Sequence, residues 1–303
     1  MPFKLTIIGS GSAVPTHTRG VTAQYINFNE RHFLIDCGEG TQLQLRKFKV
    51  KFSRLQAIFI SHLHGDHYLG LVGLLSSMSL LGRNKELHLY GPAELKELLD
   101  FQFRIAGIKL QFEIHFHPLN PDSDEVIFED RILQVSAFRV KHRINCWGFR
   151  MDEREKEKNI NPAKIEELQL TLDEILKAKK GEDIVRESAY YRNEEVTLKS
   201  APLQSYAFSA DTTYFEEMAN HVKGVSILYH EATFLEQHAD RAKKTMHSTA
   251  KQAATVAKNA QVGQLLLGHF SARYKDTSDI LEEAKSIFQN SHCVQDGEEF
   301  LLP

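Results

Sequence analysis

Short apolar runs bounded by turn residues recur along the chain and predict β-strands. The run Ala57–Ile60 is continuously apolar, which is typical of a strand buried on both faces. The expected strands are Lys4–Gly9, Thr22–Phe28, His32–Asp36, Leu55–Ile60, Leu87–Tyr90, Ile132–Val140, Leu203–Ser209, Val225–His230 and Gln264–Gly268. The helices expected between them are Tyr68–Leu81, Pro92–Phe101, Thr249–Asn259 and Ser278–Gln289. This alternation predicts an α/β fold with extensive sheet.

Residues 152–200 depart from this pattern because they are rich in charge and poor in large apolar groups. Within this stretch, Leu168–Leu176 is predicted to form part of a lone amphipathic helix. We interpret the stretch as an arm inserted into a single domain that spans residues 1–303. A solvated surface loop is the alternative for any charge-rich stretch between two strands.

The composition is that of an ordinary globular protein, with 42% hydrophobic and 25% charged residues in a chain of 303. A net charge of −3 lacks the basic footprint usual in nucleic-acid-binding proteins, so a local patch or bound cations would have to attract a phosphate. The three cysteines are far apart, which argues against a disulfide framework and for a reducing compartment. Without a signal-peptide pattern or a membrane-length apolar run, the sequence predicts a cytoplasmic protein with no membrane partner.

Three histidines and one aspartate lie close together directly after the apolar run that ends at Ile60. They are His62, His64, Asp66 and His67, and Gly65 allows the backbone to turn sharply between the two pairs. Strand ends are where α/β folds place their sites, and polar groups at this density are costly to bury without a metal or other partners. The spacing favours two metal ions. Imidazole and carboxylate ligands without thiolate favour Zn²⁺, with Mn²⁺ or Fe as alternatives.

The pattern His-x-His-x-Asp-His resembles the metal-binding motif of the metallo-β-lactamase superfamily. That superfamily also requires a further His, a bridging Asp and a last His, each at the end of a strand. His142, Asp211 and His269 follow apolar runs in this order. The resemblance implies two metals bridged by Asp211, one bound by His62, His64 and His142 and the other by Asp66, His67 and His269.

Four further segments are similar to motifs of one family within this superfamily, ribonuclease Z. They are the Gly-rich acidic segment Leu34–Gln42, His230–Phe234 (His-Glu-Ala-Thr-Phe), His247–Ala250 (His-Ser-Thr-Ala) and His269–Tyr274 (His-Phe-Ser-Ala-Arg-Tyr). Together they span most of the chain outside residues 152–200. The resemblance implies a four-layer αββα sandwich with an inserted tRNA-binding arm, two Zn²⁺ per subunit, and a homodimer.

The same resemblance implies a zinc-dependent endoribonuclease that removes the 3′ trailer from precursor tRNA. Metal-activated water would attack the phosphodiester and leave a 3′-hydroxyl on the tRNA and a 5′-phosphate on the trailer. We expect Asp66 to orient the water or accept its proton and His247 to assist the leaving 3′ oxygen. Glu231 would hold His247, and Arg273 would balance charge in the transition state. Asp36 is expected to support the site, and Ser248-Thr249 also suits a helix N-cap.

Two other classes of function remain open. The first is another hydrolase on the same fold, such as a thioesterase, lactonase, β-lactamase or aryl sulfatase. The second is a non-catalytic RNA-binding or scaffold protein that has kept the fold. The chain also departs from the ribonuclease Z pattern at Pro15–Gly20, where the Lys and Asn of the family loop are replaced. The arm lacks the family's Gly-Pro-rich segment but keeps Lys177, Lys179, Lys180 and Gly181.

Overall fold

The computed structural model describes residues 3–302 and places most strands in two seven-stranded sheets. The first sheet has the order β16-β1-β2-β3-β4-β5-β6, and β3 to β6 run parallel to one another. Its strands are β1 (Phe3–Gly9), β2 (Ala23–Phe28), β3 (Arg31–Ile35), β4 (Ala57–Phe59), β5 (Leu87–Gly91), β6 (Ile114–Pro118) and β16 (Glu299–Leu301).

The second sheet has the order β15-β14-β13-β12-β9-β8-β7, with β12 to β15 parallel. Its strands are β7 (Glu125–Glu129), β8 (Leu133–Arg139), β9 (Trp147–Glu153), β12 (Ser205–Phe208), β13 (Ile227–Glu231), β14 (Gln264–Gly268) and β15 (Ser291–Cys293). The interior strand β13 is buried at all five positions, including the polar residues His230 and Glu231 at its end.

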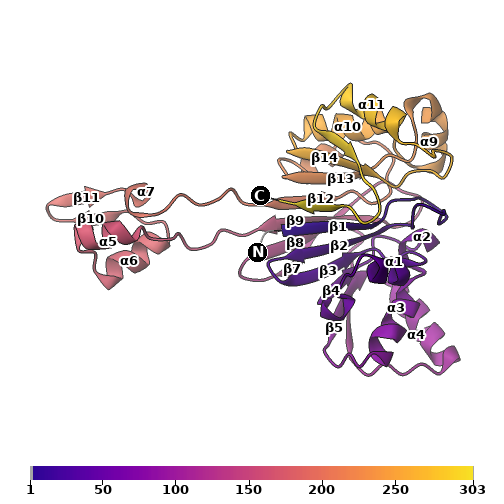
Figure 1. Cartoon of the computed structure of the whole chain (residues 1–303), viewed down its shortest axis with the longest axis horizontal. Helices are drawn as coiled ribbons and strands as arrows, with labels where there is room; N and C mark the ends of the chain where they lie inside the picture. Colours follow the sequence, from indigo (N-terminus) through magenta and orange to yellow (C-terminus); the bar gives the residue numbers. More distant parts are fainter. Residues whose placement is uncertain (1–2, 303) are drawn as a thin grey trace. The chain divides into compact units, whose positions relative to one another are not determined.

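Helices cover the outer side of each sheet, so four layers result (Figure 1). Beside the first sheet lie α1 (Thr41–Lys47), α2 (Gly65–Tyr68), α3 (Leu71–Leu80) and α4 (Glu94–Ala106), with a 3-10 turn η1 (Phe52–Arg54). Beside the second lie α9 (Ala239–Thr245), α10 (Ala250–Asn259) and α11 (Ser278–Lys285). The short helix α8 (Met218–His221) contacts α10, and the 3-10 turn η2 (Glu236–His238) contacts α9. The expected αββα arrangement is confirmed.

The expected elements are found, and the differences lie mainly at their ends. The segment Tyr68–Leu81, expected as one helix, is divided into the end of α2 and the whole of α3. The expected capping role of the Ser248-Thr249 pair is confirmed for Thr249, whose side chain accepts from the backbone N–H of Gln252 at the start of α10. Ser248 instead donates to the carbonyl of Thr212, 2.7 Å away.

The described chain divides into two compact units, and the second comprises residues 130–133 and 152–203. This unit holds α5 (Pro162–Leu168), α6 (Leu172–Lys179), α7 (Asn193–Val196) and a hairpin of β10 (Ile184–Arg186) and β11 (Ala189–Tyr191). It has its own small core of Ile160, Leu170, Ala178, Ile184 and Val196.

The expectation of one helix over Leu168–Leu176 is wrong. Gln169 takes a left-handed backbone conformation with φ 45° and ends α5. Thr171 then starts α6 through a reciprocal capping box with Glu174. Two short helices therefore pack on a shared core where the apolar spacing suggested a single one.

In the first unit, a buried cluster lies between the first sheet and its helices. It includes Leu34, Ile58 and Leu89 from the strands and Leu74 and Met78 from α3. Burial on both faces fixes β3 and β4 and, with them, the loops at their carboxyl ends. In residues 3–302, no helix combines the length and the apolar character needed to cross a membrane.

Candidate metal centre

The predicted ligands all follow strands at their carboxyl ends. His62 and His64 lie in the loop between β4 and α2, and Asp66 and His67 lie in the first turn of α2. His142 follows β8, Asp211 follows β12, and His269 comes directly after β14. Because neighbouring strands end at one edge of a sandwich, residues far apart in sequence meet there.

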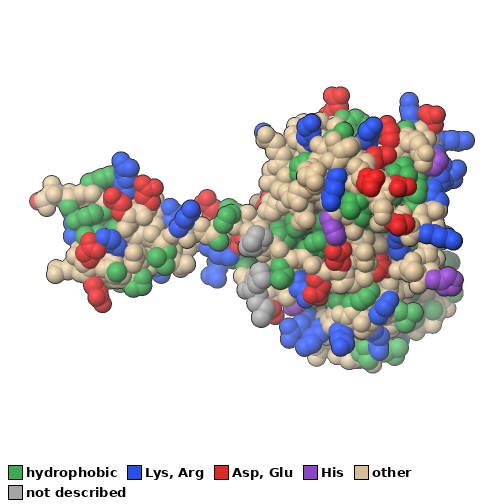
Figure 2. Space-filling view, turned by 45° about the horizontal axis from the view of Figure 1, so that its top comes forward, with side chains coloured by type: hydrophobic (Ala, Val, Ile, Leu, Met, Phe, Trp, Pro, Cys, Tyr) green, Lys and Arg blue, Asp and Glu red, His purple; other side chains and the backbone are tan. Residues whose placement is uncertain are grey.

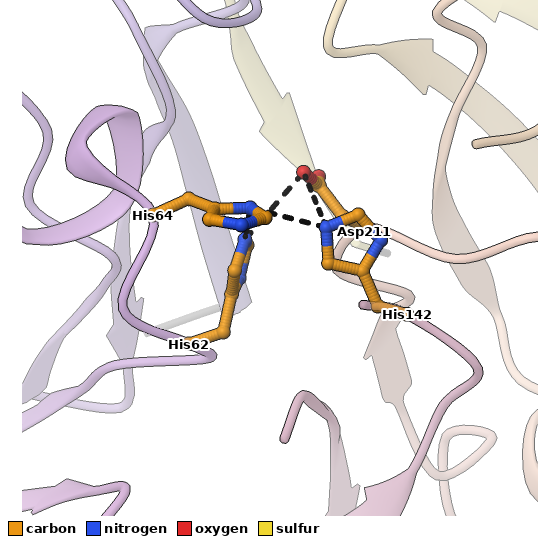
Figure 3. Close-up of side chains that lie close together, drawn as sticks. All are labelled: His62, His64, His142 and Asp211. Carbon is orange, nitrogen blue, oxygen red and sulfur yellow. Dashed lines mark hydrogen bonds and ion pairs between the residues drawn. The ribbon is translucent and has the colours of Figure 1, made fainter. Parts of the chain in front are cut away.

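The first group of side chains is His62, His64, His142 and Asp211 (Figure 3). Nδ1 of His64 lies 3.0 Å from Nε2 of His62 and 3.1 Å from Nε2 of His142. The Oδ2 atom of Asp211 is 3.6 Å from Nε2 of His62 and 4.0 Å from Nε2 of His142. Three ring nitrogens and one carboxylate oxygen thus point toward a common centre.

The second group is Asp66, His67 and His269. Nε2 of His269 lies 3.3 Å from Oδ2 of Asp66 and 3.2 Å from Oδ1 of Asp211. Nε2 of His67 lies 3.6 Å from Oδ2 of Asp66 and 3.4 Å from Oδ2 of Asp211. Asp211 faces both groups, so the structure brings all seven predicted ligands together with this carboxylate between them.

The buried atoms of this cluster fit divalent metal ions. Nε2 of His67 and Oδ1 of Asp211 are buried and have no hydrogen-bond partner among the described residues. Leaving such atoms unsatisfied is costly, whereas both are ordinary metal ligands. Two carboxylates and five imidazoles without a thiolate suit Zn²⁺, and also Mn²⁺ or Fe.

Hydrogen bonds on the far side of four rings orient the metal-facing nitrogens. His67 Nδ1 lies 2.7 Å from Oδ2 of Asp36, and His142 Nδ1 lies 2.9 Å from the carbonyl of Met246. His269 Nδ1 lies 2.9 Å from Oγ1 of Thr233, and His62 Nδ1 lies 3.0 Å from Oγ of Ser61. With the proton assigned to Nδ1 in each ring, Nε2 keeps its lone pair for a metal.

Asp36 is fully buried next to Ser61 and His67. Its carboxylate accepts from the backbone N–H of Ser61 at 2.7 Å and from the Ser61 hydroxyl at 2.8 Å, in addition to His67. Burial raises the pKa of Asp36, although His67 works in the opposite direction. The expected supporting role of Asp36 agrees with these contacts.

Glu231 holds His247 at the edge of the cluster. Its Oε1 atom lies 2.9 Å from Nδ1 of His247 and accepts from the backbone N–H of Thr212 at 2.8 Å. Its Oε2 atom accepts from the Thr233 hydroxyl at 2.6 Å. Burial opposes protonation of His247, but the charge and hydrogen bond of Glu231 prevail and raise the pKa of His247 to about 9. One carboxylate therefore connects His247 and, through Thr233, the ring of His269.

Asp66 is fixed by backbone as well as by histidines. Its Oδ2 atom accepts from the N–H of Ala13 at 2.7 Å, which ties the loop after β1 to the cluster. Burial disfavours its charge, but His67 and His269 hold the pKa of Asp66 well below its usual range. The carboxylate is therefore ionised and available as a ligand.

Left-handed backbone conformations gather around the cluster. Ala13, Asp36, Ala210, Met246 and His269 all have φ between 54° and 63°. Each of them is a ligand, contacts a ligand directly or precedes a site residue in the chain. Non-glycine residues adopt this conformation at a cost, so surrounding contacts must hold them there.

The structure places Arg273 differently from the other predicted residues. It is exposed, its Nε atom donates to Ser271 at 3.2 Å, and its guanidinium lies 5.1 Å from the centre of the Phe234 ring. That ring packs edge-on against His247, at 6.2 Å between centroids. Arg273 therefore reaches the cluster through Phe234, and its charge-balancing role remains a prediction.

The sequence analysis does not predict several supporting groups. Thr233 lies within the His-Glu-Ala-Thr motif, so this motif marks its position in the sequence. The Met246 carbonyl and the Ala13 N–H are backbone groups, which the side-chain pattern does not reveal.

The cluster opens into a hollow of about 270 Å³. Its walls include Ser12 and Pro15 from the loop after β1, Glu39 and Leu69, and the site residues Asp66 and His247. A substrate that enters this hollow meets His247 and the ligand cluster together.

Comparisons with known proteins agree with this geometry. Residues 3–158 match the family described as Anti-Pycsar protein Apyc1, a match that ends before Asp211, His247 and His269. The ribonuclease Z of Bacteroides thetaiotaomicron is 43% identical over 296 residues, which cover 97% of this chain and 94% of the relative. The ribonuclease Z of Cytophaga hutchinsonii is 42% identical over 304 residues, covering 100% and 97%.

The fold is also that of a solved human protein. The short form of human tRNase Z superposes with a TM-score of 0.74 at 27% identity, covering 99% of both chains. The metallo-β-lactamase fold protein YhfI of Bacillus subtilis shares the fold alone, with a TM-score of 0.70 at 18% identity. Sequence identity over nearly the whole length, the shared fold and the assembled ligand cluster lead to one conclusion. The chain belongs to the ribonuclease Z family and is an endoribonuclease of the metallo-β-lactamase fold.

Proposed function

We propose that this protein is a zinc-dependent endoribonuclease that removes the 3′ trailer from precursor tRNA. The observation that carries the proposal is the pair of ligand groups that share Asp211, with His247 held beside them by Glu231. Closely spaced metal pairs of this kind serve phosphodiester cleavage in many nucleases. The human tRNase Z that shares the fold supports tRNA as the substrate.

The residues that would hold the metals are those of the two groups. His62, His64 and His142 would bind one Zn²⁺, and Asp66, His67 and His269 the other, with Asp211 between them. Mn²⁺ or Fe are alternatives with the same ligand types. When bound, the metals would lower the pKa of water and offset the charge of the phosphate.

The chain's own residues would move the protons. Asp66 is the carboxylate at the hollow, where it would orient the attacking water or accept its proton. The water oxygen would bond to phosphorus as the bond from phosphorus to the 3′ oxygen breaks. Because Nδ1 of His247 contacts Glu231, its Nε2 atom is left to donate a proton to that 3′ oxygen. The products are a 3′-hydroxyl on the tRNA and a 5′-phosphate on the trailer.

Arg273 would contribute positive charge at the rim. Its guanidinium rests on Phe234, and a change of its side-chain torsions could bring it to a bound phosphate. This role agrees with the exposure of Arg273.

The second compact unit would bind the body of the tRNA. A hollow of about 790 Å³ within it is lined by five lysines, Lys156, Lys158, Lys179, Lys180 and Lys199, and three glutamates. On the face drawn in Figure 2, Lys and Arg side chains are interspersed with those of Asp and Glu. A local excess of lysine can bind phosphates despite the net charge of −3, and such binding weakens as salt rises.

The protein would work as a cytoplasmic homodimer in which one subunit's arm presents tRNA to the partner's site. The leucines Leu43, Leu80 and Leu81 are 73%, 85% and 61% exposed, and they lie on α1 and at the end of α3. A hydrogen bond from Gln42 to Ser77 ties these two helices together. Exposed leucines on joined helices suit a subunit interface, and Leu80→Glu should convert the dimer to a monomer in light scattering.

Cleavage of an end-labelled precursor tRNA with a 3′ trailer tests the activity. The zinc-loaded protein should make one cut directly after the discriminator base, and Asp66→Ala should remove it. If the protein makes no cut but hydrolyses a thioester or lactone well, precursor tRNA is rejected as the substrate, while the assignment of the fold is unaffected.

A further inference from the structure

A second hollow adjoins the ligand cluster on its His142 side. It measures about 510 Å³ and is lined in part by Leu63, Arg139, His142, Arg143 and Ile144. Its volume is in the range of pockets that hold small organic groups, roughly 300–1,000 Å³. His142 touches His64, which lines the first hollow, with their ring nitrogens 3.1 Å apart. The two hollows therefore meet at the ligand cluster.

The second hollow combines apolar surface with positive charge that forms no ion pair with a carboxylate among the described residues. Ile144 is 40% exposed although it is a large aliphatic residue, and Leu63 lies between two predicted ligands. The Cζ atom of Arg139 lies 4.6 Å from the centre of the Trp147 ring, and its Nη2 atom donates to Oδ1 of Asn145 at 3.0 Å. Its Nη1 atom is nonetheless buried and has no hydrogen-bond partner among the described residues.

Arg143 adds a second guanidinium at the mouth of the hollow. It is exposed, and its contact with the Lys244 carbonyl is long, at 3.3 Å. Among the described residues that line the hollow, Glu94 is the single carboxylate, so the two arginines outnumber it. Guanidinium groups with free N–H donors bind phosphate oxygens well, and aliphatic side chains offer a surface for a base.

We infer that this second hollow binds the first nucleotide of the trailer and the phosphate that follows it. The inference rests on the proposed function, because it uses the direction of the RNA strand. His247 lines the first hollow and not the second, and it would protonate the 3′ oxygen that stays with the tRNA. The tRNA end therefore occupies the first hollow. The cleaved phosphate remains on the trailer, whose first base continues past His142 onto Leu63 and Ile144.

The following phosphate then lies against the two arginines. Arg139 contributes a guanidinium on the wall, whose Nη1 atom has no hydrogen-bond partner among the described residues, and Arg143 contributes an exposed guanidinium. This subsite would require a trailer of at least two nucleotides for full binding, since a single nucleotide carries no second phosphate.

Trailer length tests the role of the arginines. For the holoenzyme, kcat/KM should be about tenfold higher for a two-nucleotide trailer than for a one-nucleotide trailer, the gain from a charged hydrogen bond. Arg143→Gln should lose this preference and retain the rate on the shorter trailer. Arg104→Gln, which removes an exposed arginine on α4, should keep it. Equal loss on both trailers, or no loss, would overturn the inference. Arg139→Gln, with its folding checked by circular dichroism, gives a second measurement of the same preference.

An abasic nucleotide tests the placement of the base. Placed at the first trailer position, it should lower kcat/KM severalfold for the wild type. It should lower kcat/KM little further for Ile144→Ser, because the abasic nucleotide and the substitution remove the same contact. If Ile144→Ser couples instead to an abasic last tRNA nucleotide, the strand runs in the opposite direction. A wild type that hydrolyses bis-p-nitrophenyl phosphate but cuts no precursor would reject the proposed function and this subsite together. Normal cutting without any preference rejects the subsite alone.

Discussion

Replacing Asp36 by Asn should weaken metal binding through a change in a neighbouring ring. Three donors converge on this carboxylate, at 2.7, 2.8 and 2.7 Å, and they come from Ser61 and His67. An amide offers one acceptor oxygen and turns an NH₂ group toward at least one of these donors. Of these donors, the His67 ring can most easily change its role. Its Nδ1 atom can accept a hydrogen bond from the amide NH₂ group only if the ring proton moves from Nδ1 to Nε2. That proton then occupies the atom that faces Asp66 and Asp211.

The expected magnitude follows from this loss. Supporting carboxylates of metal-binding histidines contribute about 10- to 100-fold in metal affinity. Breaking a charged buried hydrogen bond also costs about 1.5–3 kcal/mol of the free energy of unfolding. Zinc affinity is measured by competition with a fluorescent chelator, and stability by urea unfolding of the metal-free protein. Asp36→Asn should bind zinc less tightly and have a lower free energy of unfolding than the wild type.

A matched control separates this effect from general damage. Glu283 accepts from the backbone N–H groups of Glu236 and Lys251, away from the ligands. Glu283→Gln should leave zinc affinity unchanged. If Asp36→Asn binds zinc as tightly as the wild type, Asp36 does not set the position of the proton on His67.

Three further predictions concern other parts of the chain. His247→Ala should lower turnover at least a hundredfold while zinc content, measured by atomic emission, is retained; loss of zinc would mean that His247 is a ligand. The double change Lys179→Gln and Lys180→Gln should raise KM for precursor tRNA and reduce its dependence on salt, yet spare bis-p-nitrophenyl phosphate; equal loss on both substrates would count against tRNA docking by this unit. Arg83→Lys should lower the free energy of unfolding by about 2–4 kcal/mol in urea titration, because a lysine cannot reproduce the hydrogen bonds of Arg83 to the carbonyls of Lys85, Ser53, Leu55 and Glu86. An unchanged midpoint in that titration would mean that water replaces those bonds at little cost.

The side chains that the structure brings together at the candidate site are marked by local patterns in the sequence. His62 to His67 form a dense cluster after an apolar run, and His269 follows a strand that was predicted at its observed bounds, Gln264–Gly268. Patterns of this kind depend on period and burial, which one sequence displays directly.

Features set by tertiary structure could not be predicted in this way. The N–H of Ala13 reaches Asp66 only after β1 and α2 have been brought together by the sandwich. The break between α5 and α6 depends on a small core to which Leu170 and Ile184 contribute from different segments. The position of Arg273 on Phe234 likewise results from packing between loops. Hydrophobic spacing carries no information on these contacts.

The ligand cluster has a consequence for how the protein acquires its metal during folding. His62, His64, Asp66 and His67 are close in sequence, whereas Asp66 and His269 are 203 positions apart. A newly made or unfolded chain thus carries a short chelating peptide long before the remaining ligands can reach it. Metal captured by that peptide stabilises the unfolded chain and reduces the net gain from binding to the native site. Refolding should therefore be more efficient when zinc is added after the two sheets have assembled than when it is present from the start.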